Sequence, residues 1–514
     1  KSMITTVIAL TLFGCGGGEG GSGGGTTVVK NYTIDFLGTD ILNSTDGCQI
    51  FGYVERVNGQ REEVIAFRAP PPTSWYEVFI HNADGSVRQH LKGSDLNSSQ
   101  LQFRQNEVPN DGYLSFAYFR NTGGKNTLDV TTFEKAVLPD SFSIETHIDR
   151  RNDPCLGPSS ANPQIKKIKG YIERLPAVPL LSGFNTPYQN LDDITEFYQL
   201  NNPDTNPIEF HSQQRPLLAI NYATDTDGET IKSLLGFKFT PFTERGIAQS
   251  PIKLEPVDWD DSTWLEPDNW SIDNAFLFVN GKKLLTSANY AYLWQPLVQA
   301  GETINNQFSY STSIGDDNYY LYLQGQQNAN GHTHYWGIQN VAQGTTDGGG
   351  SINTNIQLDQ NQIPQAKAPQ LGTCTTDTSR QCLRINTGDL SSNTGIQRAA
   401  LSAEPIGAQT KYFIKQVFYT TIQDELPILS FNRTELDAGL DNNSVKAVIS
   451  LLISGSQEAK EAFLYQHQTF ESDRLSELEI DYIPLLKNIA AQQDFQDKLK
   501  RHPYTWVWLK TDNN

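Results

Sequence analysis

The sequence lacks the long apolar segment that a membrane-spanning helix requires. None of its 514 residues lies in a run approaching the roughly 18 consecutive apolar residues that cross a bilayer as a helix. Basic residues are also scarce, since 39 Lys and Arg face 58 Asp and Glu, for a formal net charge of −19. Such an acidic surface repels phosphate groups, which argues against nucleic-acid binding.

The motifs of common catalytic sites are absent as well. The sequence has no GxSxG nucleophile elbow, no HExxH zinc motif, no P-loop and no Rossmann glycine fingerprint. A serine triad or a carboxylate pair for glycoside hydrolysis stays open, because eight His and 58 acidic residues offer many candidates. We therefore predict that the protein is not an enzyme, and we keep an unrecognised hydrolase as an alternative.

What is present begins with residues 1–14, which have the pattern of a secretory signal. Lys1 supplies a positive charge, and an apolar stretch of about ten residues follows. The segment Leu12-Phe13-Gly14-Cys15 resembles the bacterial lipobox, with Phe13 in place of the usual small or aliphatic residue. The resemblance implies that Cys15 becomes the first mature residue and carries a lipid, such as palmitate, through a thioether.

Residues 15–30 extend this pattern. Eight of the ten residues from 16 to 25 are Gly, a composition that cannot pack a core and behaves as a flexible tether. Gly16 follows the cysteine where Asp would retain a lipoprotein at the inner membrane, by analogy with Gram-negative sorting. We predict a chain anchored in the lipid bilayer of the cell outer membrane by acylated Cys15, either periplasmic or surface-exposed.

The other four cysteines predict two disulfides. An even number of cysteines in an exported chain indicates a disulfide framework, for which three pairings exist. Cys374 and Cys382 are close in sequence and suit a hairpin or loop staple, which leaves Cys48 with Cys155. Zinc binding is the alternative, but there is no CxxC pair and no His at zinc-like spacing.

Weak internal repeats indicate the fold class. GYVER at 52–56 recurs as GYIER at 170–174. A pattern of strand, glycine turn and strand recurs around Gly124, Gly228 and Gly331, at intervals of about 100 residues, which is the size of one β-sandwich. We predict a mainly β protein of tandem Ig-like/fibronectin-like β-sandwich modules with a small C-terminal α-helical region.

The predicted organisation places sandwiches at 31–138, 139–247 and 248–347, a β-rich module at 348–431, and a helical cap with a terminal strand at 432–514. In the cap, apolar residues at helical spacing predict three helices, the first over Val445–Leu452, the second behind Ser456, and the third over Leu475–Ile489. The sequence Tyr504–Leu509 then predicts a strand. The apolar stripes fit core packing, with a docking face for a partner as the alternative.

Two clusters of polar residues are candidate metal sites. His332 and His334 are two residues apart, so they share one face of a strand and could bind one metal if a third ligand exists. Asp225, Asp227 and Glu229 surround a glycine and offer the hard oxygens that Ca²⁺ prefers. The simpler interpretation of both is an ordinary hairpin, so we predict no resident metal or cofactor.

A cluster of aromatic residues is the third candidate. Trp259, Trp264 and Trp270 lie among acids and amides, a composition that fits sugar stacking as well as core packing. The favoured function is a membrane-anchored lipoprotein whose β-domains serve as a structural and binding module of the cell envelope or surface, for adhesion to a protein or glycan partner. A carbohydrate-binding lipoprotein that uses these tryptophans is the alternative.

Overall fold

The computed structural model describes 23 segments of the chain. They are residues 30–42, 47–55, 61–122, 125–148, 153–162, 166–173, 180–186, 198–200, 207–212, 215–225, 230–263, 271–281, 290–298, 307–315, 318–329, 332–341, 343–344, 352–353, 369–385, 387, 394–406, 412–465 and 485–510. The predicted signal sequence, Cys15 and the glycine tether lie outside them. The described residues are mainly β, and none of their helices is long and apolar enough to span a bilayer.

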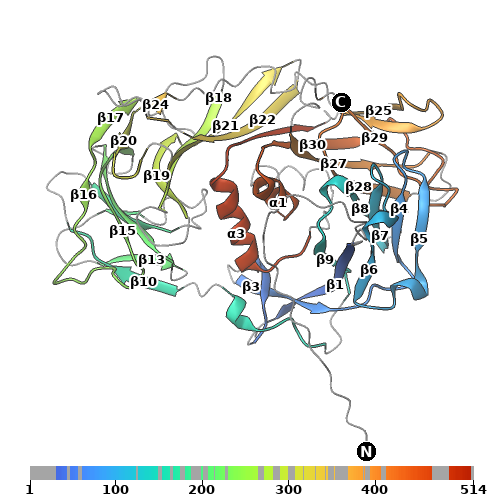
Figure 1. Cartoon of the computed structure of the whole chain (residues 1–514), viewed down its shortest axis with the longest axis horizontal. Helices are drawn as coiled ribbons and strands as arrows, with labels where there is room; N and C mark the ends of the chain where they lie inside the picture. The colour runs from blue at the N-terminus through green and yellow to red at the C-terminus, as the bar shows by residue number, and fades with distance from the viewer. Residues whose placement is uncertain are drawn as a thin grey trace, which may run out of the picture.

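One sheet of 12 strands dominates the molecule, and we call it the shared sheet (Figure 1). In spatial order its strands are β19 (Ala291–Val298), β18 (Ser271–Asn280), β21 (Tyr319–Ala329), β22 (His332–Val341), β31 (Tyr504–Lys510), β30 (Lys446–Ile453), β27 (Gly395–Ala403), β28 (Tyr412–Thr420), β8 (Lys125–Glu134), β7 (Tyr113–Thr122), β4 (Tyr76–His81) and β5 (Val87–Leu91). All neighbours are antiparallel except β28 and β8, which pair in parallel across almost 300 residues of sequence.

Two five-stranded sheets accompany it. The first contains β2 (Ile50–Glu55), β3 (Arg61–Arg68), β1 (Asn31–Leu42), β6 (Gln100–Arg104) and β9 (Ser141–Glu145). The second contains β12 (Tyr198–Leu200), β11 (Leu180–Asn185), β14 (Leu217–Thr224), β15 (Ile231–Thr240) and β16 (Glu255–Pro256).

The remaining described strands form small sheets. These are β10 (Lys166–Gly170) with β13 (Ile208–Ser212), β17 (Trp259–Thr263) with β20 (Gln307–Tyr310), β23 (Gln343–Gly344) with β24 (Ile352–Asn353), and β25 (Gln370–Thr373) with β26 (Gln381–Arg384) and β29 (Glu425–Pro427). Short 3-10 turns cover Gly93–Leu96, Gln105–Glu107, Lys135–Val137 and Ser159–Ala161.

The mainly β class is therefore confirmed, whereas tandem Ig-like/fibronectin-like sandwiches are not. Strands from the predicted segments 31–138, 248–347, 348–431 and 432–514 all enter the shared sheet. The predicted hairpins are present as β7–β8, β14–β15 and β21–β22, so the repeats mark hairpins. The module boundaries themselves stay a prediction.

Both faces of the shared sheet are buried along most of its strands, although the edge strand β5 is partly exposed. In β18, Ala275, Leu277 and Val279 enter one apolar core, while Phe276 and Phe278 enter the other. The first core also contains residues of β14 and β15, and the second contains residues of β1 and of the helices. Successive side chains of a strand point to opposite faces, so a strand covered on both sides is apolar at nearly every position.

This double burial explains why the predicted helix over Val445–Leu452 is wrong. The segment forms β30, with Ala447, Ile449 and Leu451 in one core and Val448 and Leu452 in the other. A short, continuous apolar run fits a buried strand as well as a helix, and the helical spacing of its residues was incidental.

The second predicted helix is confirmed as α1 (Gln457–Tyr465). The Oγ of Ser456 accepts a hydrogen bond from the backbone N–H of Ala459 at 3.3 Å, as expected for an N-cap. The predicted third helix falls mostly outside the described residues. Its last residue, Ile489, begins helix α3 (Ile489–Lys500), which the sequence analysis did not predict. The predicted terminal strand is confirmed as β31.

Helix α3 connects distant parts of the chain. The amide of Asn488 donates to Gln49 at 2.9 Å, and Gln492 donates to the carbonyl of Phe51 at 2.9 Å. Near the other end, Asp497 accepts from the backbone N–H of Ala291 at 3.1 Å. Both helices lie near the middle of the molecule, between the β10–β20 strands and the β1–β9 strands (Figure 1), so α3 joins the two sides.

The predicted disulfides are confirmed. Cys48 pairs with Cys155, and Cys374 pairs with Cys382 between β25 and β26. All four cysteines except Cys155 are buried. The first bond joins the start of β2, in the first predicted module, to the early part of the second predicted module.

Candidate functional site

The structure places the predicted histidine pair on β22. His332 pairs with Ala329 and His334 with Gln327 of β21. Residues two apart on a strand share a face, which agrees with the arrangement that the sequence predicts. Their side chains are outside the described part of the structure, so the metal site stays a prediction.

The predicted calcium cluster is described only at Asp225. Its carboxylate forms an ion pair with Lys232 at 3.0 Å, and its backbone N–H donates to the carbonyl of Thr230 at 2.9 Å. Both contacts close the hairpin between β14 and β15. Asp227 and Glu229 lie outside the described residues, and the described half of the cluster fits a hairpin end.

The predicted tryptophan cluster is described only at the backbone of Trp259, which pairs with Tyr310. Trp264 and Trp270 lie outside the described residues. The preceding Asp258 accepts from the N–H of Thr312 at 2.6 Å, from its hydroxyl at 2.8 Å and from Ser311 at 3.3 Å. These hydrogen bonds, led by the backbone N–H, hold the pKa of Asp258 below its usual range. The carboxylate thus fastens β17 to the loop after β20.

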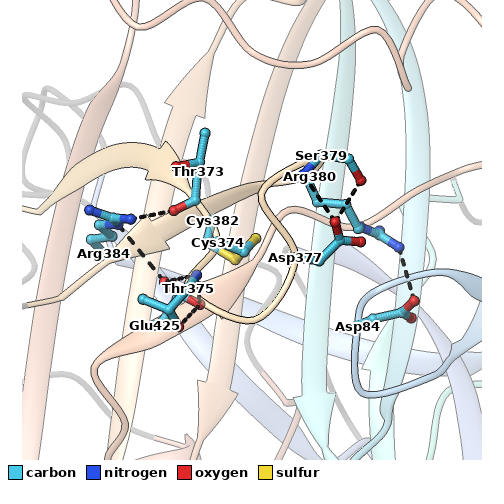
Figure 2. The surroundings of a disulfide bond; sticks show 10 residues. All are labelled: Asp84, Thr373, Cys374, Thr375, Asp377, Ser379, Arg380, Cys382, Arg384 and Glu425. Atoms are coloured by element: carbon cyan, nitrogen blue, oxygen red, sulfur yellow. Dashed lines mark hydrogen bonds and ion pairs between the residues drawn. A yellow bond between two sulfur atoms is a disulfide. The ribbon is translucent and has the colours of Figure 1, made fainter.

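The Cys374–Cys382 disulfide has a charged group beside it (Figure 2). Glu425 accepts from the N–H and the hydroxyl of Thr375, each at 3.0 Å, and faces the guanidinium of Arg384 at 3.8 Å. Within the described residues, the two sulfurs and Glu425 are the only three potential ligand groups that converge closely enough for a metal. Because the sulfurs are joined in a disulfide and are not thiolates, this cluster is not a metal site.

The other side of the same loop binds the first predicted module. Asp377 accepts from the N–H and the hydroxyl of Ser379 at 3.0 and 2.6 Å, and the neighbouring Arg380 forms an ion pair with Asp84 at 3.2 Å (Figure 2). Asp84 lies in the turn between β4 and β5. The disulfide therefore stabilises a loop that fastens the edge of the shared sheet.

A buried ion cluster has a similar role. Glu77 is 8% exposed, and its two carboxylate oxygens contact Nε2 of His90 at 3.0 Å and Nη2 of Arg433 at 2.7 Å. The guanidinium of Arg433 also lies 4.2 Å from the ring centre of Phe119. Both carboxylate oxygens of Glu77 have a partner. The cluster therefore holds the loop around Arg433, between β29 and β30, against β4 and β7.

An open groove on the second five-stranded sheet has a different character, and we call it the basic groove. It has a volume of about 580 Å³ and is lined by Lys238, Thr240, Thr243, Glu244, Arg245, Gly246, Ile247, Ser250, Pro251, Ile252 and Lys253. Lys238 comes from β15, and the others come from the end of that strand and the loop after it. Three cations and one anion line it, in a chain of net charge −19.

The loop of the basic groove is fixed by its backbone. Gly246 has φ +72°, and a Cβ there would lie 2.4 Å from the carbonyl oxygen of Tyr171, so only glycine fits. Ile247 and Ser250 pair with each other and close a tight turn. Arg245 donates from Nε to Lys169 at 3.3 Å and from Nη1 to Phe242 at 2.9 Å, both at backbone carbonyls.

Sequence analysis missed the basic groove because its residues are ordinary surface types. The local signal was Glu244-Arg245-Gly246, a turn sequence with no motif attached. No family model matches the chain, and no curated protein matches its sequence.

Proposed function

We propose that this protein is a cell-envelope lipoprotein, anchored through acylated Cys15, whose β-structure acts as a binding module at the membrane surface. The observation that carries the proposal is the pairing of the cysteines in disulfides. The sequence has five, and four of them form the two disulfides. Cys15, at the end of the lipobox-like segment, is left with no cysteine in the chain to pair with and is available for a thioether.

The disulfides also support export. Such bonds persist in oxidising compartments outside the cytoplasm, which is where a lipoprotein resides. The glycine run after Cys15 would give the β-structure reach from the bilayer. The binding role is supported by the basic groove, an open surface site whose volume lies in the usual range for ligand sites.

The test is mass spectrometry of the N-terminus of the mature protein purified from membrane fractions. We expect a peptide that begins at Cys15 and carries a diacylglycerol thioether with an added acyl chain. The Cys15→Ser variant is the matched control, because it removes only the thiol, and we expect it to move to the soluble fraction. A membrane-bound Cys15→Ser protein, or a mature chain with an unmodified thiol at this position, would overturn the anchoring.

A further inference from the structure

The cations of the basic groove are available to a ligand. Lys238 and Lys253 form no ion pair with any described residue, and Lys253 is exposed. Arg245 uses Nε and Nη1 on backbone carbonyls, and within the described structure nothing accepts from Nη2. Its guanidinium is thus held in place, which lowers the entropic cost of binding an anion.

The rest of the lining is mixed. The hydroxyls of Thr243 and Ser250 are at exposed positions, while Ile247, Pro251 and Ile252 contribute apolar surface. The hydroxyl of Thr240 is occupied, since it donates to the carbonyl of Glu244 at 2.8 Å. Cations, hydroxyls and aliphatic groups together match a ligand that has anionic groups, hydroxyls and C–H surfaces.

We propose that the basic groove binds an acidic oligosaccharide, a sugar chain that bears carboxylate or sulfate groups. The lysines and Arg245 would pair with the acidic groups, and Thr243 and Ser250 would exchange hydrogen bonds with the sugar hydroxyls. This assignment rests on the binding role proposed above and is independent of how the chain is anchored.

Two other anionic ligands fit less well. A volume of about 580 Å³ far exceeds a single phosphate ion, and an open groove does not enclose one. A bilayer with anionic head groups would need several apolar side chains to insert. Ile247, 59% exposed, is the only large hydrophobic residue of the groove that is exposed.

The experiment is titration of the full chain carrying Cys15→Ser, in buffer without detergent so that lipid vesicles stay intact, with oligomers of polygalacturonate and of dextran sulfate. Neutral dextran, inorganic phosphate and phosphatidylglycerol vesicles are the comparison ligands. The test variant is Lys238→Gln/Lys253→Gln. The matched control is Lys30→Gln/Lys92→Gln, which removes the same two charges from exposed positions outside the groove. Equal thermal unfolding midpoints will show that all chains are folded.

We expect at least one acidic oligosaccharide to bind, with affinity at least tenfold lower in the groove variant and less than twofold lower in the control. Raising the salt concentration should weaken binding, and Glu244→Gln, which removes the only acid of the lining, should strengthen it two- to threefold. Equal losses in both double variants, no binding of either acidic oligosaccharide, or groove-dependent binding of phosphate or vesicles alone would overturn the proposal. Each of these results leaves the mass of the Cys15 peptide, and hence the anchoring, unaffected.

Discussion

The region that spans residues 166–256 and the rest of the chain are built into the molecule in different ways. The described strands between residues 166 and 256 form their own sheets and contribute none to the shared sheet. Strands from the segments before and after it interleave, as where β8 pairs with β28 and β22 with β31. Residues 166–256 therefore form separate sheets that pack beside the shared sheet, whereas strands from the segments before and after them are joined within it.

The apolar cores show the same contrast. In β14, Leu218, Ile220 and Tyr222 enter the large core beside the shared sheet. Leu217 and Ala219 face the other way, into a small core that includes Phe184 and Ile252. Damage to the large cores should therefore reach the whole molecule, whereas damage to the small core should stay local and disturb only the basic groove.

The largest expected effect concerns the disulfide that holds the segment before residues 166–256 to the start of β2. Cys48→Ser/Cys155→Ser opens a loop with a sequence separation of 107 residues, which should cost about 5 kcal/mol on the loop-closure model. Cys374→Ser/Cys382→Ser opens a separation of 8 residues and should cost about half as much. Denaturant unfolding of both variants measures the difference, and equal losses would mean that loop length does not govern these bonds.

The next effect is a disruption of the shared sheet. Trp506 is 1% exposed and packs on Phe463 of α1 with ring centres 4.8 Å apart. Trp506→Ala should cost about 4 kcal/mol because it leaves a cavity in the core. Hydrogen exchange should show faster opening on both sides of β31, in β22 and β30 alike. Faster exchange in only one of these strands would show that the sheet is not a single cooperative unit.

A smaller and local effect is expected in the second module. Phe184 is fully buried and stacks on Phe210 with ring centres 4.6 Å apart. Phe184→Ala should cost about 3 kcal/mol, seen as faster exchange in β10, β13 and β14. Exchange in β27 and β30 should not change. Equally faster hydrogen exchange in β27 and β30 would show that residues 166–256 and the shared sheet do not unfold separately.

The smallest effect is a pH dependence in α3, where Asp497 contacts Ala291 of β19. Burial raises the pKa of Asp497 to about 6, above its value of about 3.9 in an unfolded chain. The folded state therefore binds the proton more tightly, and this group's contribution to stability falls as pH rises from about 4 to about 6, by about 2 kcal/mol.

Asp497→Asn should remove that fall while keeping an acceptor for the N–H of Ala291. The measurement is the difference in unfolding free energy between wild type and variant, at pH 4 and at pH 6.5, since other carboxylates cancel in the difference. A difference that is the same at both pH values would show that Asp497 is not the group responsible.

The sequence predicted those features that depend on neighbouring residues. Glycine turns between apolar strands predicted the hairpins, and Ser456 predicted the start of α1. The cysteine count and spacing gave the disulfide pairing. The helix over Val445–Leu452 was wrong because burial on both faces removes the alternation that identifies a strand. The pairing of β8 with β28, and the meeting of Lys238 with Lys253, depend on contacts between distant segments, which periodicity does not encode.

Strand β31 has a consequence for how the protein is made. It fills the position between β22 and β30, yet it lies at residues 504–510. During synthesis, both neighbouring strands therefore have an unpaired edge until β31 is made. Such edges are templates for pairing with other chains. A chaperone that shields open strand edges would be most needed before this segment is made, and a chain stalled short of residue 504 would be prone to aggregate rather than fold as a smaller version of the same protein.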